Sequence, residues 1–379
     1  MLLPGDPCPP FCGRTSSKPA FHFDTMGGRT LVLAFFVSSA FDLGRRFLAA
    51  LEPIAHRFDD RNVSFFGVSI DPGDESEGRL RDRRPGRRYF FDPDRRISAL
   101  LGVCKPQGEG RADMYTPLVY VFDARLRVAG VIPLADPEQC VAQLAGLLDR
   151  LPPTGDPVPA QSQAPVLVVP HVLEPDLRAR LIALYDERGG ELSGHMTERD
   201  GRTVGELNAL MKVRRDRYIE DEALKETLRD RLRRRLLPEI AKAYQFRATH
   251  IERYLVACYD GTERGHFHAH RDNTTKGTAH RQFAVSVALN DGYEGGEVYF
   301  PEFGNALFRA PAGGAVVFSC SLLHAVRPVT AGRRMVFLPF VYDGAHAALR
   351  RANLGFLGVA KPAEAEAAEA AEAAETAEA

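Results

Sequence analysis

Residues 313–342, GGAVVFSCSLLHAVRPVTAGRRMVFLPFVY, contain two apolar segments of strand length, GGAVVFSCS and RRMVFLPFVY. Segments of the same kind recur from Arg247 onward with glycine-rich turns between them: ERYLVACY, QFAVSVALN, GGEVYFP and ALFRAP. Many short strands joined by such turns are typical of a β-sandwich or jelly roll. We therefore expect the C-terminal half to form an all-β core, a double-stranded β-helix (jelly roll).

Helical patterns precede these strands and are expected to flank the sheet. After a short strand, VLVVPHVL, the segment DLRARLIALYDE is opened by Glu174, Pro175 and Asp176, residue types that favour a helix start. A second helical block spans residues 224–244. It places three leucines on one face, which should pack on a sheet: Leu224, Leu228 and Leu232.

Proline and small polar residues mark a boundary between two domains. The stretch PPTGDPVPAQSQAP follows Leu151 directly and has the composition of an extended linker. A chain of 379 residues is long for one compact core and suits two domains. We expect a first domain over residues 1–151, a linker over 152–164, a second domain over 165–345, and an extension over 346–379 whose Ala/Glu-rich tail is solvated and frayed.

The first domain alternates strand-like and helix-like segments: RTLVLAFFV, FLAALEPIAHRF, VSFFGVSI, TPLVYVF, RVAGVIP and QCVAQLAGLLDRL. This order predicts an α/β domain. The continuous apolar runs LVLAFFV and VSFFGVSI suit central strands covered on both faces, and LVYVF with RVAGVIP suits an antiparallel pair. A thioredoxin-like sheet fits this layout, so the chain is expected to be an α+β protein of two domains.

The composition is that of an ordinary globular protein, with 45% hydrophobic and 26% charged residues. No apolar run is long enough to cross a membrane, and the first residues lack the features of a secretory signal, so we expect a cytoplasmic protein. The net charge of -1 includes six glutamates in the tail. Six scattered cysteines favour reduced thiols over a disulfide framework, and the pair Cys8 and Cys12 has no second pair with which to form a metal site.

The stretch CYDGTERGHFHAHRDN places His270 and Asp272 two residues apart, so both side chains project to the same side of an extended backbone. His324 follows 52 residues after Asp272, on a predicted strand. Two imidazoles and one carboxylate form the facial triad of non-haem Fe(II) oxygenases, which leaves coordination positions open for a 2-oxo acid and dioxygen. The sequence therefore predicts an iron site at these three residues.

Arg334 stands ten residues after His324, at the head of the strand RRMVFLPF. An arginine at this place can form a two-pronged salt bridge with the far carboxylate of a 2-oxo acid. Strand alternation sends Arg334 to one face and Arg333 to the other. We expect Arg334 to face the site and Arg333 to be solvated.

Three segments resemble the 2-oxoglutarate/Fe(II) oxygenase superfamily, in its prolyl 4-hydroxylase-like branch: VACYDGTERGHFHAHRDN, YEGGEVYFPEFG and LLHAVRPVTAGRR. The resemblance covers roughly residues 165–345. It implies that the His-Asp-His set binds the iron, that Arg334 binds the 2-oxoglutarate carboxylate, and that the hydroxyl of Tyr259 assists. One position departs from the family pattern, because Ala288 stands where several prolyl hydroxylases have a second tyrosine beside the cosubstrate.

The activity that this resemblance implies is oxidative decarboxylation of 2-oxoglutarate to succinate and carbon dioxide, coupled to hydroxylation of a substrate C–H bond. The implied cofactors are Fe(II), 2-oxoglutarate and O2, with ascorbate as a further reductant. The branch suggests a prolyl residue of a protein as substrate, while small molecules and other side chains stay open. The sequence predicts neither the oligomeric state nor the groups that orient the ligands.

Four polar neighbours of the predicted ligands are expected to have supporting roles. His266 and His268 alternate with His270 along HFHAH, yet a filled iron site has no use for them, so we expect them at its rim. Arg271 and Asn273 flank Asp272 and are expected to orient the substrate or the groups that surround the ligands.

Two further pairs of residues are candidates for the neighbourhood of the same site. His280 and Arg281, in GTAHRQF, either line the substrate mouth or lie in a surface loop. Cys258 and Cys320 lie within strand patterns, so we expect buried thiols rather than ligands.

A basic cluster in MKVRRDRY gathers Lys212, Arg214, Arg215 and Arg217, and five more arginines follow over residues 229–235. Such a cluster can attract nucleic acid or an acidic peptide. Interleaved aspartate and glutamate residues favour a solvated helix face instead. We therefore predict no nucleic-acid partner.

The first domain resembles a peroxiredoxin through GDPCPPF and through FFVSSAFDLG, which occupies the place of the active-site motif P-x-x-x-T-x-x-C. Val37, Phe41 and Gly44 stand where that motif has its proline, threonine and peroxidatic cysteine. Peroxide reduction needs a thiolate at this helix start, so the resemblance implies the fold without the peroxidase activity. Cys104 and Cys140 are expected to be buried or incidental thiols, with a redox role in another arrangement left open.

The leading hypothesis is therefore an Fe(II)/2-oxoglutarate dioxygenase joined to a redoxin-like domain. A thiol-dependent peroxidase or reductase is a second hypothesis, and Gly44 argues against it. A non-catalytic jelly-roll binding protein is a third, and the ordered set of the three ligands with Arg334 argues against it.

Overall fold

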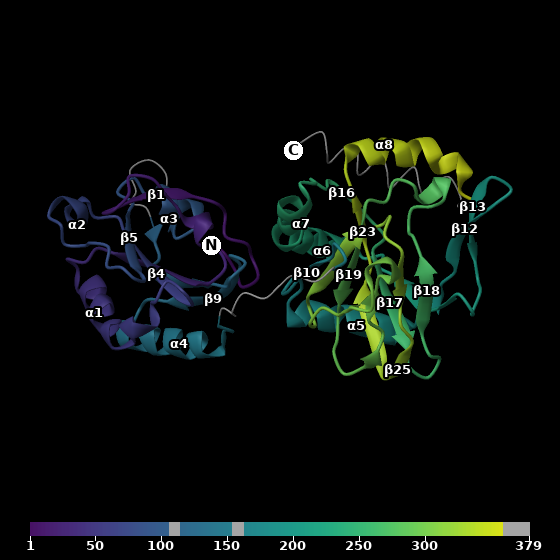
Figure 1. Cartoon of the computed structure of the whole chain (residues 1–379), viewed down its shortest axis with the longest axis horizontal. Helices are drawn as coiled ribbons and strands as arrows, with labels where there is room; N and C mark the ends of the chain where they lie inside the picture. Colours follow the sequence, from purple (N-terminus) through teal and green to yellow (C-terminus); the bar gives the residue numbers. More distant parts are fainter. Residues whose placement is uncertain (106–113, 154–162, 359–379) are drawn as a thin grey trace. The chain divides into compact units, whose positions relative to one another are not determined.

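The computed structural model describes residues 1–105, 114–153 and 163–358 (Figure 1). The chain divides into two compact units, Met1–Pro159 and Ala160–Ala379. Most of the expected linker and the whole Ala/Glu-rich tail lie outside the described residues. None of the helices in the described part of the chain is long and apolar enough to cross a membrane.

The first unit contains a seven-stranded sheet: β1 (Cys12–Thr15), β2 (Phe21–His22), β3 (Thr30–Val37), β4 (Val63–Ser69), β5 (Arg87–Phe91), β8 (Leu118–Phe122) and β9 (Val128–Pro133). The strand order is β2-β1-β5-β4-β3-β8-β9. Strands β3, β4 and β5 are parallel, and β8 and β9 form the antiparallel pair that the sequence predicts. A separate small pair joins β6 (Cys104–Lys105) to β7 (Met114–Tyr115).

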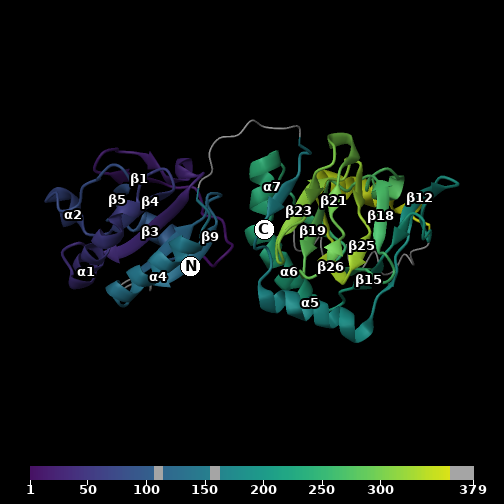
Figure 2. The same cartoon turned by 60° about the horizontal axis from the view of Figure 1, so that its bottom comes forward.

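Both faces of this sheet are buried, as the continuous apolar runs predict. Along β3, Leu31, Leu33 and Phe35 enter one core cluster, and their alternating neighbours enter the other. The helices of the unit are α1 (Asp42–Ala50), α2 (Pro72–Ser76), α3 (Arg96–Leu100) and α4 (Pro137–Arg150), with 3-10 turns at Phe23–Met26 and Glu52–Arg57. Helices α1 and α4 lie on the same face of the sheet (Figure 2).

The helix predicted over residues 47–58 is wrong at both ends. Helix α1 begins at Asp42 and ends at Ala50, and a 3-10 turn continues the chain. Pro53 lies in that turn, and proline has no N–H with which to continue an α-helix.

The second unit contains two main sheets. The larger has nine strands: β10 (Leu167–Val169), β11 (Glu191–Leu192), β15 (Arg215–Tyr218), β16 (His250–Glu252), β17 (Leu255–Asp260), β19 (Phe283–Ala288), β23 (Ala315–Ser319), β26 (Arg333–Phe337) and β27 (Phe340–Tyr342). The smaller has five: β14 (Lys212–Val213), β18 (His266–His270), β21 (Val298–Tyr299), β22 (Leu307–Phe308) and β24 (His324–Val326). A hairpin of β12 (His195–Arg199) with β13 (Arg202–Glu206) and a pair of β20 (Glu294–Gly295) with β25 (Val329–Ala331) complete the strands of the described part.

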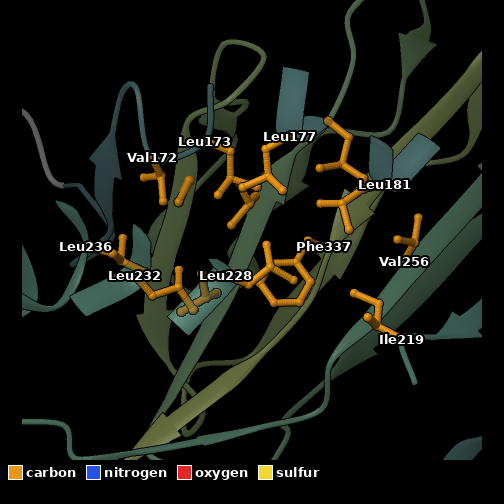
Figure 3. Close-up of a cluster of buried hydrophobic side chains, with 14 of the residues drawn as sticks. Val172, Leu173, Leu177, Leu181, Ile219, Leu228, Leu232, Leu236, Val256 and Phe337 are labelled. Atoms are coloured by element: carbon orange, nitrogen blue, oxygen red, sulfur yellow. The ribbon is translucent and has the colours of Figure 1, made fainter. Parts of the chain in front are cut away.

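Helices cover the outer face of the larger sheet. They are α5 (Pro175–Arg188), α6 (Glu222–Arg235) and α7 (Leu237–Tyr244); α8 (Gly344–Asn353) follows the last strand, and short 3-10 turns occur at Lys276–Thr278, Pro301–Phe303 and Leu354–Phe356. Figure 3 shows the core beneath α5 and α6, where helix leucines meet Val256 and Phe337 of the sheet. The predicted packing of Leu224, Leu228 and Leu232 on a sheet is confirmed.

A second apolar core lies between the two sheets and leads to the site. Ala257 and Tyr259 of β17 and Phe318 of β23 meet Phe267 and Val326 of the smaller sheet. The sandwich arrangement expected after Arg247 is therefore present. The strand predicted over residues 166–173 is shorter than expected, because β10 ends at Val169, directly before Pro170.

Candidate active site

The structure brings His270, Asp272 and His324 together at the end of the smaller sheet. His270 ends β18 and lies directly opposite His324, which begins β24. The Asp272 carboxylate lies between the two imidazoles, 3.6 Å from Nε2 of His270 and 3.4 Å from Nε2 of His324. One ligand atom from each residue lies within 4.8 Å of the other two, so the three side chains can share one metal ion.

Backbone carbonyl groups orient both imidazoles. Nδ1 of His270 lies 2.8 Å from the carbonyl oxygen of His268, and Nδ1 of His324 lies 2.9 Å from that of Leu322. A carbonyl oxygen can only accept, so each Nδ1 donates its proton and each Nε2 keeps a free lone pair. This is the tautomer that a metal ligand requires.

Burial sets the protonation states of this group. Burial lowers the pKa of His324 to about 4, so its imidazole is neutral at pH 7. Burial opposes ionisation of Asp272, but attraction to the protonated forms of His324 and His270 and to Arg281 holds the pKa of Asp272 well below its usual range. The donor set at neutral pH therefore includes a carboxylate and a neutral imidazole, which suit a divalent metal ion.

Arg334 lies on the neighbouring strand β26 and is buried. Its Nη2 donates to Ser286 Oγ at 3.0 Å, and its guanidinium carbon lies 5.0 Å from the centre of the Tyr259 ring, directly across the strand pair. Gly296, with a φ of +71°, makes room for it, since a Cβ there would lie 2.7 Å from Arg334 Cδ. Arg333 points the other way, is exposed, and pairs with Asp186 at 2.8 Å, as alternation predicts.

The three grouped residues, Arg334 and Tyr259 line one cavity of about 450 Å³. Ala288 is buried but does not line it, so Ser286, two residues earlier on β19, provides the contact to Arg334 instead. The sequence gives no distinct signal for Ser286, because a small polar residue in an apolar strand is common.

The basic stretch around Lys212 is not a solvated helix face, and that prediction is wrong. It forms strands β14 and β15, whose alternation buries Lys212, Arg214 and Asp216 and leaves Arg215 and Arg217 outside. Arg214 donates to both oxygens of Asp216, at 2.7 and 2.6 Å. Lys212, Arg214 and Asp216 occur at every second position, a spacing that is typical of a strand. The many charges of this stretch favour a solvated helix instead, so the strand spacing is easily missed.

Lys212 is a buried basic residue of the cavity wall. Burial, with the nearby charge of Arg214, lowers the pKa of Lys212 to about 6. Its Nζ donates to Ser193 Oγ at 2.7 Å and to the carbonyl oxygen of Gly194 at 2.6 Å, and it lies 4.9 Å from the centre of the Phe267 ring.

The arginines of the second basic run are not uniformly solvated either. Arg235 is buried and donates to Glu174 at 2.7 Å, and Arg231 donates to the other oxygen of Glu174 at 2.8 Å. These contacts tie α6 to the start of α5. The leucines between them are buried, so α6 is an amphipathic helix with a partly paired basic side.

Both expectations for His280 are wrong. His280 is buried and hydrogen-bonded to Glu252, which also accepts from Arg281 at 2.8 Å. This carboxylate fixes two basic residues of one loop, and Arg281 also lines the cavity. Cys258 and Cys320 are buried, as predicted.

The neighbours of Asp272 make mostly structural contacts. Arg271 pairs with Glu302 at 2.7 Å while lining the cavity, and Asn273 donates to Ser321 Oγ at 2.8 Å. His268 is exposed and His266 half-buried, and neither belongs to the group of potential metal ligands.

The corresponding region of the first unit has no thiol and no room for one. Gly44 is buried in the first turn of α1, and a Cβ there would lie 2.0 Å from the carbonyl oxygen of Ser38. Ser38 and Ser39 donate to the carboxylates of Asp71 and Asp74, each at 2.6 Å. The loop before α1 is therefore filled by serine–aspartate hydrogen bonds.

Two thiols of this unit, those of Cys8 and Cys140, are poor nucleophiles. Burial raises the pKa of Cys8 and that of Cys140 to about 12, so both are protonated at neutral pH. Cys104 is buried, and no disulfide joins any two cysteines of the described residues.

Two family models match the chain, one in each unit. Residues 254–342 match the 2OG-Fe(II) oxygenase superfamily, and residues 4–131 match the AhpC/TSA family. The N-terminal unit is thus similar to the AhpC/TSA family and the C-terminal unit to the 2OG-Fe(II) oxygenase superfamily, and both units are made mostly of sheets with helices.

Curated relatives match the oxygenase part. A PKHD-type hydroxylase of Maricaulis maris is 30% identical over 146 residues, which cover 37% of this chain and 64% of the relative. A PKHD-type hydroxylase of Thioalkalivibrio sulfidiphilus is 29% identical over 144 residues, covering 35% and 63%. The chain therefore spans slightly less than two thirds of these relatives.

Solved structures are similar to each of the two units, and one example is given for each. The peroxidoxin BcpB of Mycobacterium tuberculosis is 17% identical, with a TM-score of 0.34, and the match covers 39% of this chain and 97% of that one. A prolyl hydroxylase of Trichoplax adhaerens, solved with a hypoxia inducible factor peptide, is 17% identical, with a TM-score of 0.37 and coverage of 49% and 87%.

Proposed function

We propose that the C-terminal unit, as an oxygenase domain over residues 165–345, is an Fe(II)- and 2-oxoglutarate-dependent dioxygenase that hydroxylates its substrate. His270, Asp272 and His324 would hold the iron, and Arg334 would bind the far carboxylate of 2-oxoglutarate. The two facing sheets correspond to a double-stranded β-helix with the site at one end. Residues 1–151 form a redoxin-like domain without peroxidase activity.

One observation supports this proposal above the others: the His-Asp-His group and a buried arginine line the same cavity. The donor set fits Fe(II), since two imidazoles and one carboxylate with open positions are typical of non-haem iron oxygenases. Bound Fe(II) supplies the activation of O2 that couples decarboxylation of 2-oxoglutarate to hydroxylation of a C–H bond.

The residues of the chain would bind the iron and 2-oxoglutarate and orient the ligand side chains. The carbonyl groups of His268 and Leu322 hold the two imidazoles in the ligand tautomer. Arg334 offers a planar, permanently charged fork, already positioned by Ser286 and the Tyr259 ring, so little side-chain freedom is lost when a carboxylate binds. Phe267 stacks on the His270 ring at 3.4 Å, and Phe318 lies 4.5 Å from that of His324; these rings exclude water from the ligands.

The substrate that we favour is a prolyl residue of a protein. The resemblance to the prolyl 4-hydroxylase-like branch supports it, and the curated relatives carry the name hydroxylase. Ascorbate would serve as a reductant in this class of enzyme.

An anaerobic titration tests the proposal. Purified full-length protein should bind Fe(II) and 2-oxoglutarate with a weak visible absorption band, and air should then release succinate slowly even without substrate. A peroxide-consumption assay on the same protein should show no catalysis. If the band and succinate are absent while peroxide is consumed, the thiol peroxidase hypothesis replaces this one.

A further inference from the structure

The cavity wall around the iron site is strongly cationic. Six basic side chains line it, against three acidic ones. The basic residues are Lys212, Arg214, Arg253, Arg271, Arg281 and Arg334, and the acidic ones are Asp216, Glu252 and Asp272. Buried cations normally have an anionic partner, so a basic residue of this wall without one is a candidate to bind an anionic ligand.

Three of the six have a carboxylate of the chain as a hydrogen-bonded partner. Arg214 has Asp216, Arg271 has Glu302, and Arg281 has Glu252. Asp272, the remaining acid of the cavity, belongs to the proposed iron site. Arg334, Lys212 and Arg253 are left without a hydrogen-bonded carboxylate among the described residues, and the proposed function gives Arg334 to 2-oxoglutarate.

Arg253 lies in the cavity wall, and its N–H donors lack a hydrogen-bond acceptor among the described residues. Its nearest carboxylate oxygen, on Asp216, is 3.9 Å away and already accepts from Arg214. Its guanidinium carbon lies 5.0 Å from the centre of the Phe340 ring, a contact that uses none of its N–H donors in a hydrogen bond. The side chain is 20% exposed, so a ligand in the cavity can reach it.

The backbone directs this side chain at a conformational cost. Arg253 has a φ of +69°, a left-handed conformation that is uncommon for a residue with a side chain. It falls in the break between β16, which pairs with β27, and β17, which pairs with β15 and β26. A strained residue at a strand break beside a cavity is the kind of position at which function outweighs local stability.

Lys212 lies in the same wall and close to the iron site. Its amino group and the His270 ring both contact Phe267. Its present partners, a hydroxyl and a carbonyl oxygen, are neutral. Burial lowers the pKa of Arg253, with the charges of Arg214 and Arg281 adding to the effect, which is consistent with a pocket that lacks an anion.

We propose that Arg253 binds a carboxylate of the substrate, with Lys212 of the same cavity wall as a further donor, so that the enzyme selects acidic substrates. This inference rests on the proposed function and deepens it. The guanidinium fork suits two parallel hydrogen bonds to a carboxylate. The carboxylate can belong to an acidic side chain next to the hydroxylated residue or to a free amino acid, and the chemistry recognised is the same.

Two pairs of probes test this on the anaerobic Fe(II)–2-oxoglutarate complex of the full chain, by titration of its absorption band. The first pair is acetyl-Pro-Glu-amide and acetyl-Pro-Gln-amide, and the second is acetyl-proline and acetyl-prolinamide. The members of each pair differ only by a carboxylate against an amide. We expect the acid to bind about ten- to hundredfold more tightly in one pair, the range expected for a hydrogen-bonded charge. The pair that discriminates shows whether the carboxylate comes from a side chain or from the amino acid itself.

Variants then assign the preference to Arg253. Arg253→Gln should remove it, and Arg253→Lys should keep part of it, since a lysine retains the charge but not the fork. Arg215→Gln is the control, because Arg215 is exposed on β15, pairs with Glu263 and does not line the cavity. This variant should keep the full preference.

Three results would overturn the inference. They are equal binding of acid and amide in both pairs, no binding of any probe at millimolar concentration, and an equal loss of preference in Arg215→Gln and Arg253→Gln. A wild-type protein that forms no Fe(II)–2-oxoglutarate band would instead refute the proposed function. The two failures are therefore distinguishable.

Discussion

The two units differ most at the places where each fold would carry out chemistry. In the C-terminal unit, small and glycine residues keep a cavity open, and Gly296 leaves space for the Arg334 side chain. In the N-terminal unit, the backbone of Ser38 packs directly against Gly44, so no space remains there for a side chain. The comparison shows that a recognisable fold says little about activity until the space around the key position is known.

Removal of a proposed iron ligand in the C-terminal unit should have the largest effect on activity. His324→Ala should lower succinate release by more than about hundredfold, because loss of even the groups that orient ligands costs about ten- to hundredfold. Uncoupled succinate release from 2-oxoglutarate measures the effect. His268→Ala, an exposed residue on the same strand as His270, serves as control and should keep the rate. Equal losses in the two variants would refute the assignment.

The next largest effect is expected at the cosubstrate. Arg334→Gln should raise the KM for 2-oxoglutarate by about ten- to hundredfold, since a buried charge-assisted pair is lost. Initial-rate kinetics at varied 2-oxoglutarate concentration check this. Arg333→Gln removes the same charge from the neighbouring exposed residue and should leave KM unchanged. An unaltered KM in Arg334→Gln would mean that another group binds the carboxylate.

Restoring a cysteine in the N-terminal unit sharpens the contrast. Gly44→Cys should lower the free energy of unfolding by about 1–3 kcal/mol, the usual cost of overpacking, and should give no peroxidase activity. Chemical unfolding and a peroxide assay measure the two outcomes. Gly146→Cys, on α4, meets only an Arg150 side-chain atom at 3.8 Å and should be tolerated. Peroxide turnover by Gly44→Cys would show that the site needs only a thiol.

A smaller, pH-dependent effect is expected in the same unit. Asp60 accepts from both terminal nitrogens of Arg88 at 2.8 Å, and this contact holds the pKa of Asp60 below its ordinary value of 3.8. Its stabilisation is therefore complete above that value and is lost as the pH falls below it. Asp60→Asn should cost about 1 kcal/mol at pH 7 and less at pH 3, where part of the stabilisation is already lost, as thermal unfolding at both pH values would show. An equal cost at both would exclude the ionised carboxylate as the cause.

The sequence predicted the elements whose signals are local. Apolar runs predicted the central strands β3 and β4, and the leucine spacing predicted the buried face of α6. The H-x-D spacing and the position of His324 drew attention to three residues that the structure does bring together. Strand alternation also separated Arg334 from Arg333 correctly.

What the sequence missed depends on contacts between distant segments. The carbonyl acceptors of the two imidazoles are backbone atoms and leave no trace in residue identity. Glu252 lies 28 residues from His280, so their buried pair could not be inferred from either neighbourhood. The charges around Lys212 predict a solvated helix face, whereas pairing of β15 with β17 and the contact of Arg214 with Asp216 bury part of this stretch.

The close packing at Gly44 also has a consequence for protein engineering. The carbonyl oxygen of Ser38 lies 2.0 Å from the place of a side-chain carbon at position 44, so a single substitution there does not create a thiol centre. A design that adds one would have to change the loop before α1 and its serine–aspartate contacts at the same time. A new active site in this unit is therefore better built away from the start of α1.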